Sequence, residues 1–233
     1  MSTQDIPTAS AAVQESLARL DVNTVGVAAI SNLKDSKLAK MALHLLPGAR
    51  SITVFAMEVF PEILDHSRPK RTTGMASLND LLNRHTDYLN GRLTKAAYDV
   101  AKVSRSHGLK ALPLPAEGCP YDARFLKAVL PYKQVAQAAG LGTIGRSSLL
   151  VTPDFGPRVR LAGCLTEAQL ETGITTVTDV CQDCEICITH CPSKALSLPL
   201  AEEPYAINKF ACSVFCGAAA GCSECIRLCP AGR

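Results

Sequence analysis

The chain has 233 residues, of which 47% are hydrophobic and 19% charged. This composition is typical of a folded protein of one or two domains, and it excludes disorder as the main state. The formal net charge is only +3 and tryptophan is absent, so neither a basic stripe nor a stacking platform for nucleic acid is indicated. Apolar runs fall short of the roughly 20 residues that span a bilayer. The polar N-terminal segment lacks a signal-peptide pattern, so we expect a cytoplasmic protein without a membrane or nucleic-acid partner.

In chain order, the first half alternates helical and strand patterns. Helices are predicted from Ser10 onward, over 35–46 and over 77–107. Buried strands are predicted at 24–30, 51–57 and 109–114. The polar segment 61–74 predicts a loop, and Gly108 follows the long helix as a C′ glycine should.

The pattern changes at residue 132. A short helix and a glycine-rich turn are followed by predicted strands at 149–152 and 158–165, joined by a Pro-Asp-Phe-Gly-Pro turn. Alternating strands and helices suggest an α/β or α+β layered domain, and we predict the α+β class for residues 1–172. A smaller, cysteine-rich domain is predicted over 173–233.

The strongest signal is the distribution of cysteine. Of eleven cysteines, nine fall between Cys181 and Cys229. In a reducing compartment such clustering indicates metal or redox chemistry. The run Cys-x2-Cys-x2-Cys-x3-Cys-Pro at 181–192 has the spacing of bacterial ferredoxins with cubane iron–sulfur clusters. A second run, at 222–230, repeats the latter part of the pattern and needs one upstream cysteine, which Cys212 or Cys216 could supply.

The crossed rule of two-cluster ferredoxins predicts which cysteines bind each [4Fe-4S] cluster. The ligands of cluster one are Cys181, Cys184, Cys187 and Cys229. Those of cluster two are Cys191, Cys222, Cys225 and either Cys212 or Cys216. The alternatives are a structural zinc site and a disulfide framework. Zinc sites commonly pair two short knuckles across a longer spacer, which fits this dense spacing poorly.

Three other residues carry local predictions. Cys164 lies in an apolar strand, where a thiol behaves as a small hydrophobe. Cys119 lies in a loop and is either an exposed structural residue or a redox-active thiol. His190 precedes Cys191, and we expect it to donate a hydrogen bond to a cluster sulfur.

The element Ala138-Ala139-Gly140-Leu141-Gly142-x-x-Gly145-Arg146, followed by two cubane motifs, resembles the epoxyqueuosine reductases and the related reductive dehalogenases. The resemblance is clearest over residues 132–230. It implies a nitroreductase-like α/β sandwich domain that holds a cobalamin, followed by a ferredoxin-like module with two [4Fe-4S] clusters. It also implies an iron–sulfur oxidoreductase that passes electrons through both clusters to the corrinoid cobalt. The corrinoid, reduced to Co(I), is then either the catalyst or the substrate.

The resemblance further implies contacts between the cobalamin and the glycine-rich turn with its preceding helix. The residues are Lys133, Gly140, Leu141, Gly142, Gly145 and Arg146. Glycine permits close approach of the backbone to a flat ligand, and tight helix–strand packing is the equally weighted alternative.

Two further assignments follow from the resemblance. A Cys-x2-aromatic pattern usually supplies the distant cluster ligand in this family, which favours Cys212 over Cys216 because Phe215 follows at that spacing. Tyr132 is the candidate proton donor, with Tyr121 and Glu117 as weaker candidates. The alternative for Tyr132 is a structural role, in which it anchors the helix through one hydrogen bond.

Two other functions stay open. One is an electron-transfer protein of ferredoxin type without a corrinoid, and the other is epoxyqueuosine reduction on tRNA. For the main function we expect a low-potential electron donor of ferredoxin or flavodoxin type. A corrinoid protein and a second copy of the chain, forming a homodimer, are further candidate partners.

Overall fold

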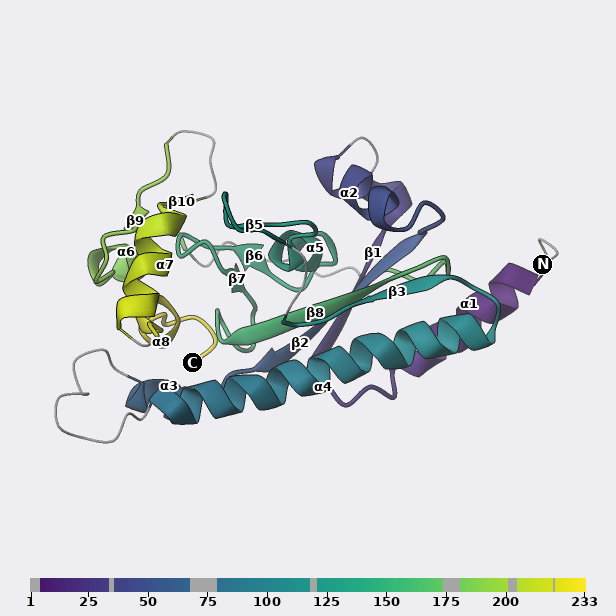
Figure 1. The fold of residues 1–233 in the computed structure, drawn as a ribbon, viewed down its shortest axis with the longest axis horizontal. Coiled ribbons are helices and arrows are strands. Elements are labelled where there is room, and N and C mark those ends of the chain that lie inside the picture. The colour runs from purple at the N-terminus through teal and green to yellow at the C-terminus, as the bar shows by residue number, and fades with distance from the viewer. Residues whose placement is uncertain are drawn as a thin grey trace. The chain divides into compact units, whose positions relative to one another are not determined.

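The structure is a computed structural model (Figure 1). It describes residues 5–33, 36–67, 79–117, 121–173, 181–200, 205–219 and 221–233. The chain forms two compact units, each built from separate stretches of sequence. The first unit contains Met1–Met57, Leu89–Leu141 and Arg160–Thr176; the second contains Glu58–Tyr88, Gly142–Val159 and Val177–Arg233. None of the described helices combines the length and apolar character needed to cross a bilayer.

A four-stranded sheet organises the first unit, in the order β1-β2-β8-β3. The strands are β1 (Thr24–Ala29), β2 (Ser51–Glu58), β8 (Val159–Thr166) and β3 (Ala111–Leu114). β1 and β2 are antiparallel, with Val27 opposite Thr53. β3 and β8 are also antiparallel, with Leu112 opposite Leu165. The first six positions of β2 are all buried, so buried and exposed positions do not alternate along it, and its buried Thr53 hydroxyl donates to the carbonyl oxygen of Cys164 at 3.1 Å.

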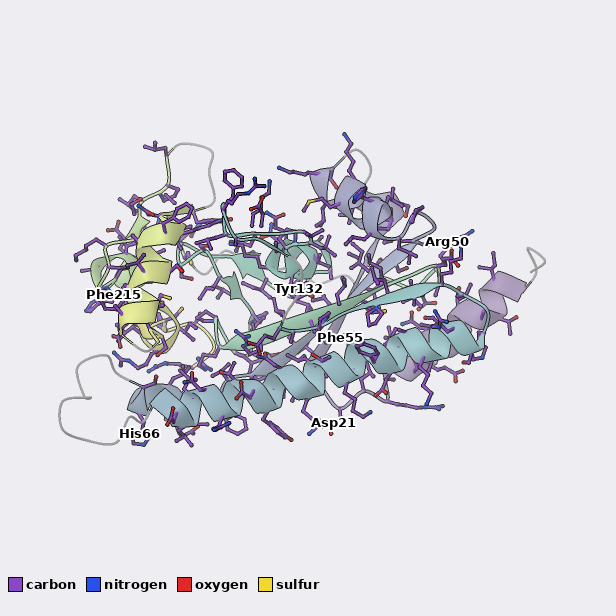
Figure 2. All side chains as sticks on the ribbon, in the orientation of Figure 1. Asp21, Arg50, Phe55, His66, Tyr132 and Phe215 are labelled. Carbon is purple, nitrogen blue, oxygen red and sulfur yellow. The ribbon has the colours of Figure 1, made fainter. Side chains whose placement is uncertain are left out.

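Helices supply the other half of the first unit's core. They are α1 (Asp5–Leu17), the 3-10 helix η1 (Ile30–Leu33), α2 (Lys37–Leu45), α4 (Asn79–Ser106, of which the part from Leu89 lies in this unit) and α5 (Tyr132–Ala138). Val13, Leu93 and Val100 belong to one core cluster with Phe55 of β2, and Phe55 is labelled in Figure 2. A short hairpin of β4 (Tyr121–Asp122) and β5 (Lys127–Ala128) completes the unit.

The second unit is made of short elements. They are α3 (Pro61–His66), β6 (Thr143–Ile144), β7 (Leu150–Val151), α6 (Ile186–Thr189), β9 (Leu196–Ser197), β10 (Ala206–Ile207), α7 (Lys209–Ala218) and α8 (Glu224–Arg227). Its small core cluster is Cys191, Ala195 and Leu196, with Cys187, Cys212 and Cys225 packed against it. Several of its core side chains are therefore thiols.

The mixed α/β class predicted from the sequence is confirmed, and the strands run antiparallel. Two local predictions were wrong. Ser10 does not cap α1, which begins at Asp5; instead its hydroxyl accepts a hydrogen bond from the Gln169 amide at 3.0 Å. Residues 61–66 are helical rather than a loop, because Pro61 at the first helical position suits a helix start. The rest of that segment, from residue 68, lies outside the described residues.

Candidate metal centre

Four cysteine thiols from two distant segments interact in the second unit. Cys181, Cys184 and Cys187 lie on and just before α6, and Cys229 follows α8. The pKa of Cys187 is raised to about 11, first by burial and then by repulsion from the other three thiols. Burial also raises the pKa of Cys229, and Cys181 and Cys184 add to it. The four residues predicted for cluster one thus lie near one another.

A second group gathers around α7 and α8. Burial raises the pKa of Cys225 to about 12, and the nearest thiols, Cys222 and Cys212, contribute next, followed by Cys187 and Cys191. Cys212 and Cys216 stand one turn apart on α7, and the pKa of Cys216 is also raised to about 12, by burial first. Cys212 influences both Cys225 and Cys222, and the Cys216 thiol contacts those of Cys212 and Cys222.

These thiols are neighbours that do not converge on one point. Among the described residues, no three side chains of His, Cys, Asp or Glu lie close enough to share a single metal ion. A single zinc ion holds its sulfur ligands at about 2.3 Å. In a cubane each thiolate binds a different iron, so the four sulfurs stand farther apart.

The glycine-rich turn packs against the first cysteine loop. A Cβ atom on Gly145 would lie 2.8 Å from the sulfur of Cys181 and 2.8 Å from a methyl of Val151. Next to it, Arg146 donates to the carbonyl oxygen of Cys184 at 3.1 Å and faces Glu185 at 3.8 Å. The missing side chain at position 145 therefore makes room for a predicted cluster ligand.

Gly142 has a different neighbour in the same unit. A Cβ atom there would lie 2.2 Å from the carbonyl oxygen of Val151, which pairs with the next residue, Thr143, in the β6–β7 hairpin. Close strand packing alone accounts for this glycine. For Gly142 and Gly145 the packing alternative thus has direct contacts, while a contact with cobalamin stays a prediction.

The remaining residues predicted to bind a cobalamin or donate a proton lie in the first unit. Gly140 has φ +78°, a conformation that glycine adopts without strain. Leu141 is buried against Gly26 of β1, and Lys133 is half-buried on α5. The Tyr132 hydroxyl donates to the carbonyl oxygen of Pro115 at 2.7 Å, which is the contact expected for a helix anchor (Figure 2). Its role as a proton donor stays a prediction.

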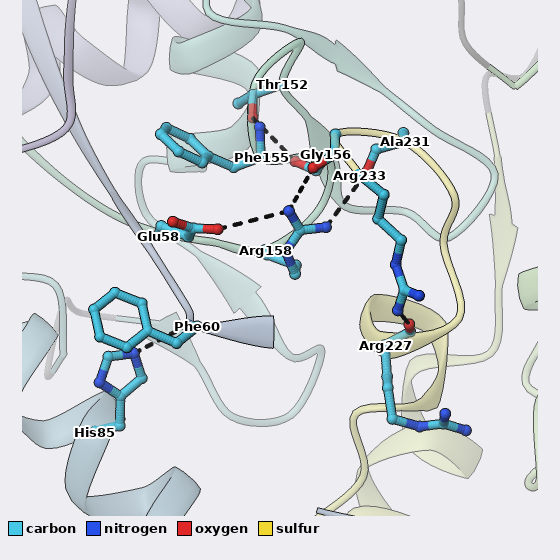
Figure 3. A network of polar contacts seen from close by, with 11 residues as sticks. Glu58, Phe60, His85, Thr152, Phe155, Gly156, Arg158, Arg227, Ala231 and Arg233 are labelled. Atoms are coloured by element: carbon cyan, nitrogen blue, oxygen red, sulfur yellow. Dashed lines mark hydrogen bonds and ion pairs between the residues drawn. The ribbon is translucent and has the colours of Figure 1, made fainter. Parts of the chain in front are cut away.

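A buried arginine was not anticipated. Arg158 is only 3% exposed, and its guanidinium donates to the carbonyl oxygens of Ala231 at 3.4 Å and Gly232 at 2.6 Å (Figure 3). It also faces Glu58 at 3.6 Å. Its sequence segment was predicted as a strand; the available signal was a charged residue at the edge of an apolar run.

A second polar network lies in the first unit. Asn90 donates to the Glu117 carboxylate at 3.0 Å and accepts from Nε of Arg160 at 3.1 Å. Burial lowers the pKa of Arg160, and the nearby Glu117 charge opposes that shift. The sequence had singled out Glu117 alone, because its two partners lie on α4 and β8, far away along the chain.

Three other predictions can be compared with the structure. Cys164 lies in the first unit's core, and burial raises its pKa to about 12, as a structural thiol requires. The His190 ring nitrogen Nδ1 hydrogen-bonds the carbonyl oxygen of Ile186 at 3.0 Å, and a hydrogen bond from this ring to a cluster sulfur stays a prediction. Cys119 lies outside the described residues.

No family model matches the chain. Sequence comparison does find homologues of both expected kinds. The tetrachloroethene reductive dehalogenase of Desulfitobacterium hafniense is 29% identical over 157 residues, covering 59% of this chain and 26% of the dehalogenase. The epoxyqueuosine reductase of Synechococcus sp. (strain RCC307) is 29% identical over 126 residues, covering 48% of this chain and 38% of the reductase. The matches therefore span about a quarter to two fifths of these relatives.

Solved structures of both kinds share the fold. A reductive dehalogenase, whose structure suggested a mechanism for B12-dependent dehalogenation, aligns with a TM-score of 0.68 at 15% identity over 91% of this chain and 30% of its own. An epoxyqueuosine reductase with a tRNA stem loop aligns with a TM-score of 0.59 at 18% identity over 97% of this chain and 66% of its own. The resemblance predicted from the sequence is confirmed. The chain is related to reductive dehalogenases and epoxyqueuosine reductases.

Proposed function

We propose that the protein is an iron–sulfur oxidoreductase that passes electrons through two [4Fe-4S] clusters to a bound corrinoid. The observation that carries this proposal is the grouping of the thiols. Cys187 is influenced by Cys181, Cys184 and Cys229, and Cys225 most strongly by Cys222 and Cys212, with a smaller effect of Cys187. These neighbours support the two sets that the crossed ferredoxin rule predicts, each of which combines residues from separate motifs. The proposed ligands are Cys181, Cys184, Cys187 and Cys229 for one cluster, and Cys191, Cys212, Cys222 and Cys225 for the other.

Two features of the chain fit a cluster beside the first group. Gly145 lets the turn approach the Cys181 sulfur closely, since a Cβ there would lie only 2.8 Å from it, so the predicted ligand loop packs directly on the turn. The buried Nε of Arg158 has no hydrogen-bond partner among the described residues. An unpartnered buried donor is expected where an inorganic group completes the site.

The clusters would supply one-electron transfer and the corrinoid a reducible cobalt centre. The chain's own part is to bind and to shield. Cluster assembly must deprotonate thiols such as Cys187 and Cys225, whose pKa values burial and mutual repulsion raise to about 11 and about 12. Loading is therefore accompanied by proton release. The Arg146 guanidinium donates a hydrogen bond to the carbonyl oxygen of Cys184 and so fixes the loop that bears this predicted ligand.

The corrinoid part rests on the relatives, one of which is described as carrying out B12-dependent dehalogenation. Among the residues assigned to corrinoid binding, Lys133, Gly140 and Arg146 are half-buried and so have surface to offer a ligand, whereas the other three are buried. We assign Tyr132 the role of proton donor, with its phenol held in place by the hydrogen bond to Pro115.

The test starts from protein purified without oxygen. Elemental analysis should find about eight irons per chain, the content of two cubanes. Cobalamin added at micromolar concentration should then shift to a base-off spectrum. Eight irons without cobalamin binding would favour the ferredoxin-type alternative. A colourless protein with stoichiometric zinc would refute both functions.

The tRNA alternative is supported by the relatives named epoxyqueuosine reductase. It predicts that the gene restores queuosine in a strain that lacks its own epoxyqueuosine reductase. For each redox function, the proposed partner is a low-potential donor of ferredoxin or flavodoxin type. Reduction of the protein by such a donor, followed in the visible spectrum, tests that partner.

A further inference from the structure

Arg158 carries a charge in an environment that does not fully compensate it. Burial of a guanidinium is costly unless ion pairs and hydrogen bonds satisfy it. Two of its nitrogens donate to backbone carbonyls, and its ion-pair partner, Glu58, stays at 3.6 Å. The Nε group is buried and finds no acceptor within the described residues.

Arg158 binds the chain segment that directly follows Cys229, a member of the first cysteine group. The carbonyls it binds, those of Ala231 and Gly232, follow Cys229 by two and three residues. Figure 3 shows Arg158 lying between Glu58 and the C-terminal carbonyls.

We propose that Arg158 raises the reduction potential of the cluster bound by Cys181, Cys184, Cys187 and Cys229. This inference rests on the proposed function. The step is the addition of one electron from a low-potential donor; no covalent bond is made or broken and no proton is needed. The reduced form carries one more negative charge, and a buried positive charge stabilises it more than the oxidised form. Net charge and hydrogen bonds to sulfur are known determinants of cluster potential.

The Glu58 carboxylate partly cancels this effect, which gives the proposal a two-sided test. Removing the positive charge in Arg158→Gln should lower the potential. Removing the negative charge in Glu58→Gln should raise it, because the charge of Arg158 is then less compensated. A purely structural role for the pair predicts no such opposite signs.

The experiment is an EPR-monitored redox titration of the full chain without oxygen, with dithionite as reductant. In Arg158→Gln, one of the two midpoint potentials should become more negative. At a fixed potential the ratio of reduced to oxidised cluster should fall about tenfold, which is about 59 mV for one electron. The matched control is Arg84→Gln, which removes an exposed arginine of α4 that faces Asp87 at 4.0 Å. Its potentials should equal those of the unsubstituted protein.

The outcomes separate clearly. Unchanged potentials in both variants, or shifts in the same direction, would overturn the inference. Where Arg158→Gln fails to retain its clusters, Glu58→Gln decides alone: a higher potential supports the inference and an unchanged one overturns it. An iron count is taken first. Fewer than about eight irons in the unsubstituted protein refutes the proposed function, whereas a full count with unchanged potentials refutes only the role of Arg158.

Discussion

Substitution of Gly145 by alanine tests the link between the glycine-rich turn and the cysteine loop. The new Cβ would lie 2.8 Å from both the Cys181 sulfur and a methyl of Val151, whereas ordinary contacts begin at 3.4 Å. Each neighbour must therefore retreat by about half an ångström or more. Overpacking of this kind costs about 1–3 kcal/mol. We expect Gly145→Ala to retain less iron and to lose its cluster absorption at lower denaturant concentration.

Gly91→Ala is the matched control. Gly91 lies within α4, and nothing lies within 4 Å of the Cβ that alanine would add. The same change there should stabilise the protein by about 0.5–1 kcal/mol, because glycine is a poor helix former. Iron content and the midpoint of denaturant-induced bleaching, measured without oxygen, compare the two variants. If Gly145→Ala matched Gly91→Ala in both measurements, the close approach of Gly145 to Cys181 would contribute nothing to stability or cluster retention, and the predicted link between the turn and the cysteine loop would be refuted.

Three further predictions follow from the thiols and one histidine. Burial raises the pKa of Cys164 to about 12, so the protonated thiol stabilises the folded state fully below about pH 9. As pH rises toward 12 this contribution to the free energy of unfolding is lost, by at most about 1.4 kcal/mol per pH unit. In Cys164→Ala the free energy of unfolding, measured over a pH series, should therefore fall less steeply at alkaline pH. Burial lowers the pKa of His85, so stability should fall as pH drops below about 6.5; His85→Gln, which keeps an acceptor for the Phe60 amide, should remove that acid slope in the same assay. By iron analysis, Cys212→Ser should lose about four irons and Cys216→Ser none.

Local sequence signals were sufficient where local physics decides the structure. Gly108, predicted as the C′ residue of the long helix, takes φ +75° directly after α4. They failed where tertiary contacts decide. Ser10 resembles a helix cap, yet it is buried inside α1 and binds a backbone amide 159 residues away. Leu81 continues the apolar stripe of α4 but is 47% exposed.

The candidate site divides in the same way. Motif spacing singled out the cysteines, because a cubane imposes its own spacing on a short loop. No spacing rule could find Arg158, Glu58 and His85, which come from three separate segments and meet only in the folded second unit. Buried charge compensation is a property of the assembled structure. A lone arginine at the edge of an apolar strand is the only trace of it in the sequence.

The contacts change the meaning of the glycine-rich turn. The resemblance implies that its glycines contact a corrinoid. In the structure a Cβ atom on Gly142 would clash with the backbone of Val151, and a Cβ atom on Gly145 would clash with the sulfur of Cys181. The carbonyl contact of Arg146 to Cys184 extends the same link. Gly145 and Arg146 would thus be required by the iron–sulfur function even in a protein that bound no corrinoid, whereas strand packing accounts for Gly142. Gly145 is therefore evidence for the cysteine module, and the case for a corrinoid has to be made from cobalamin binding itself.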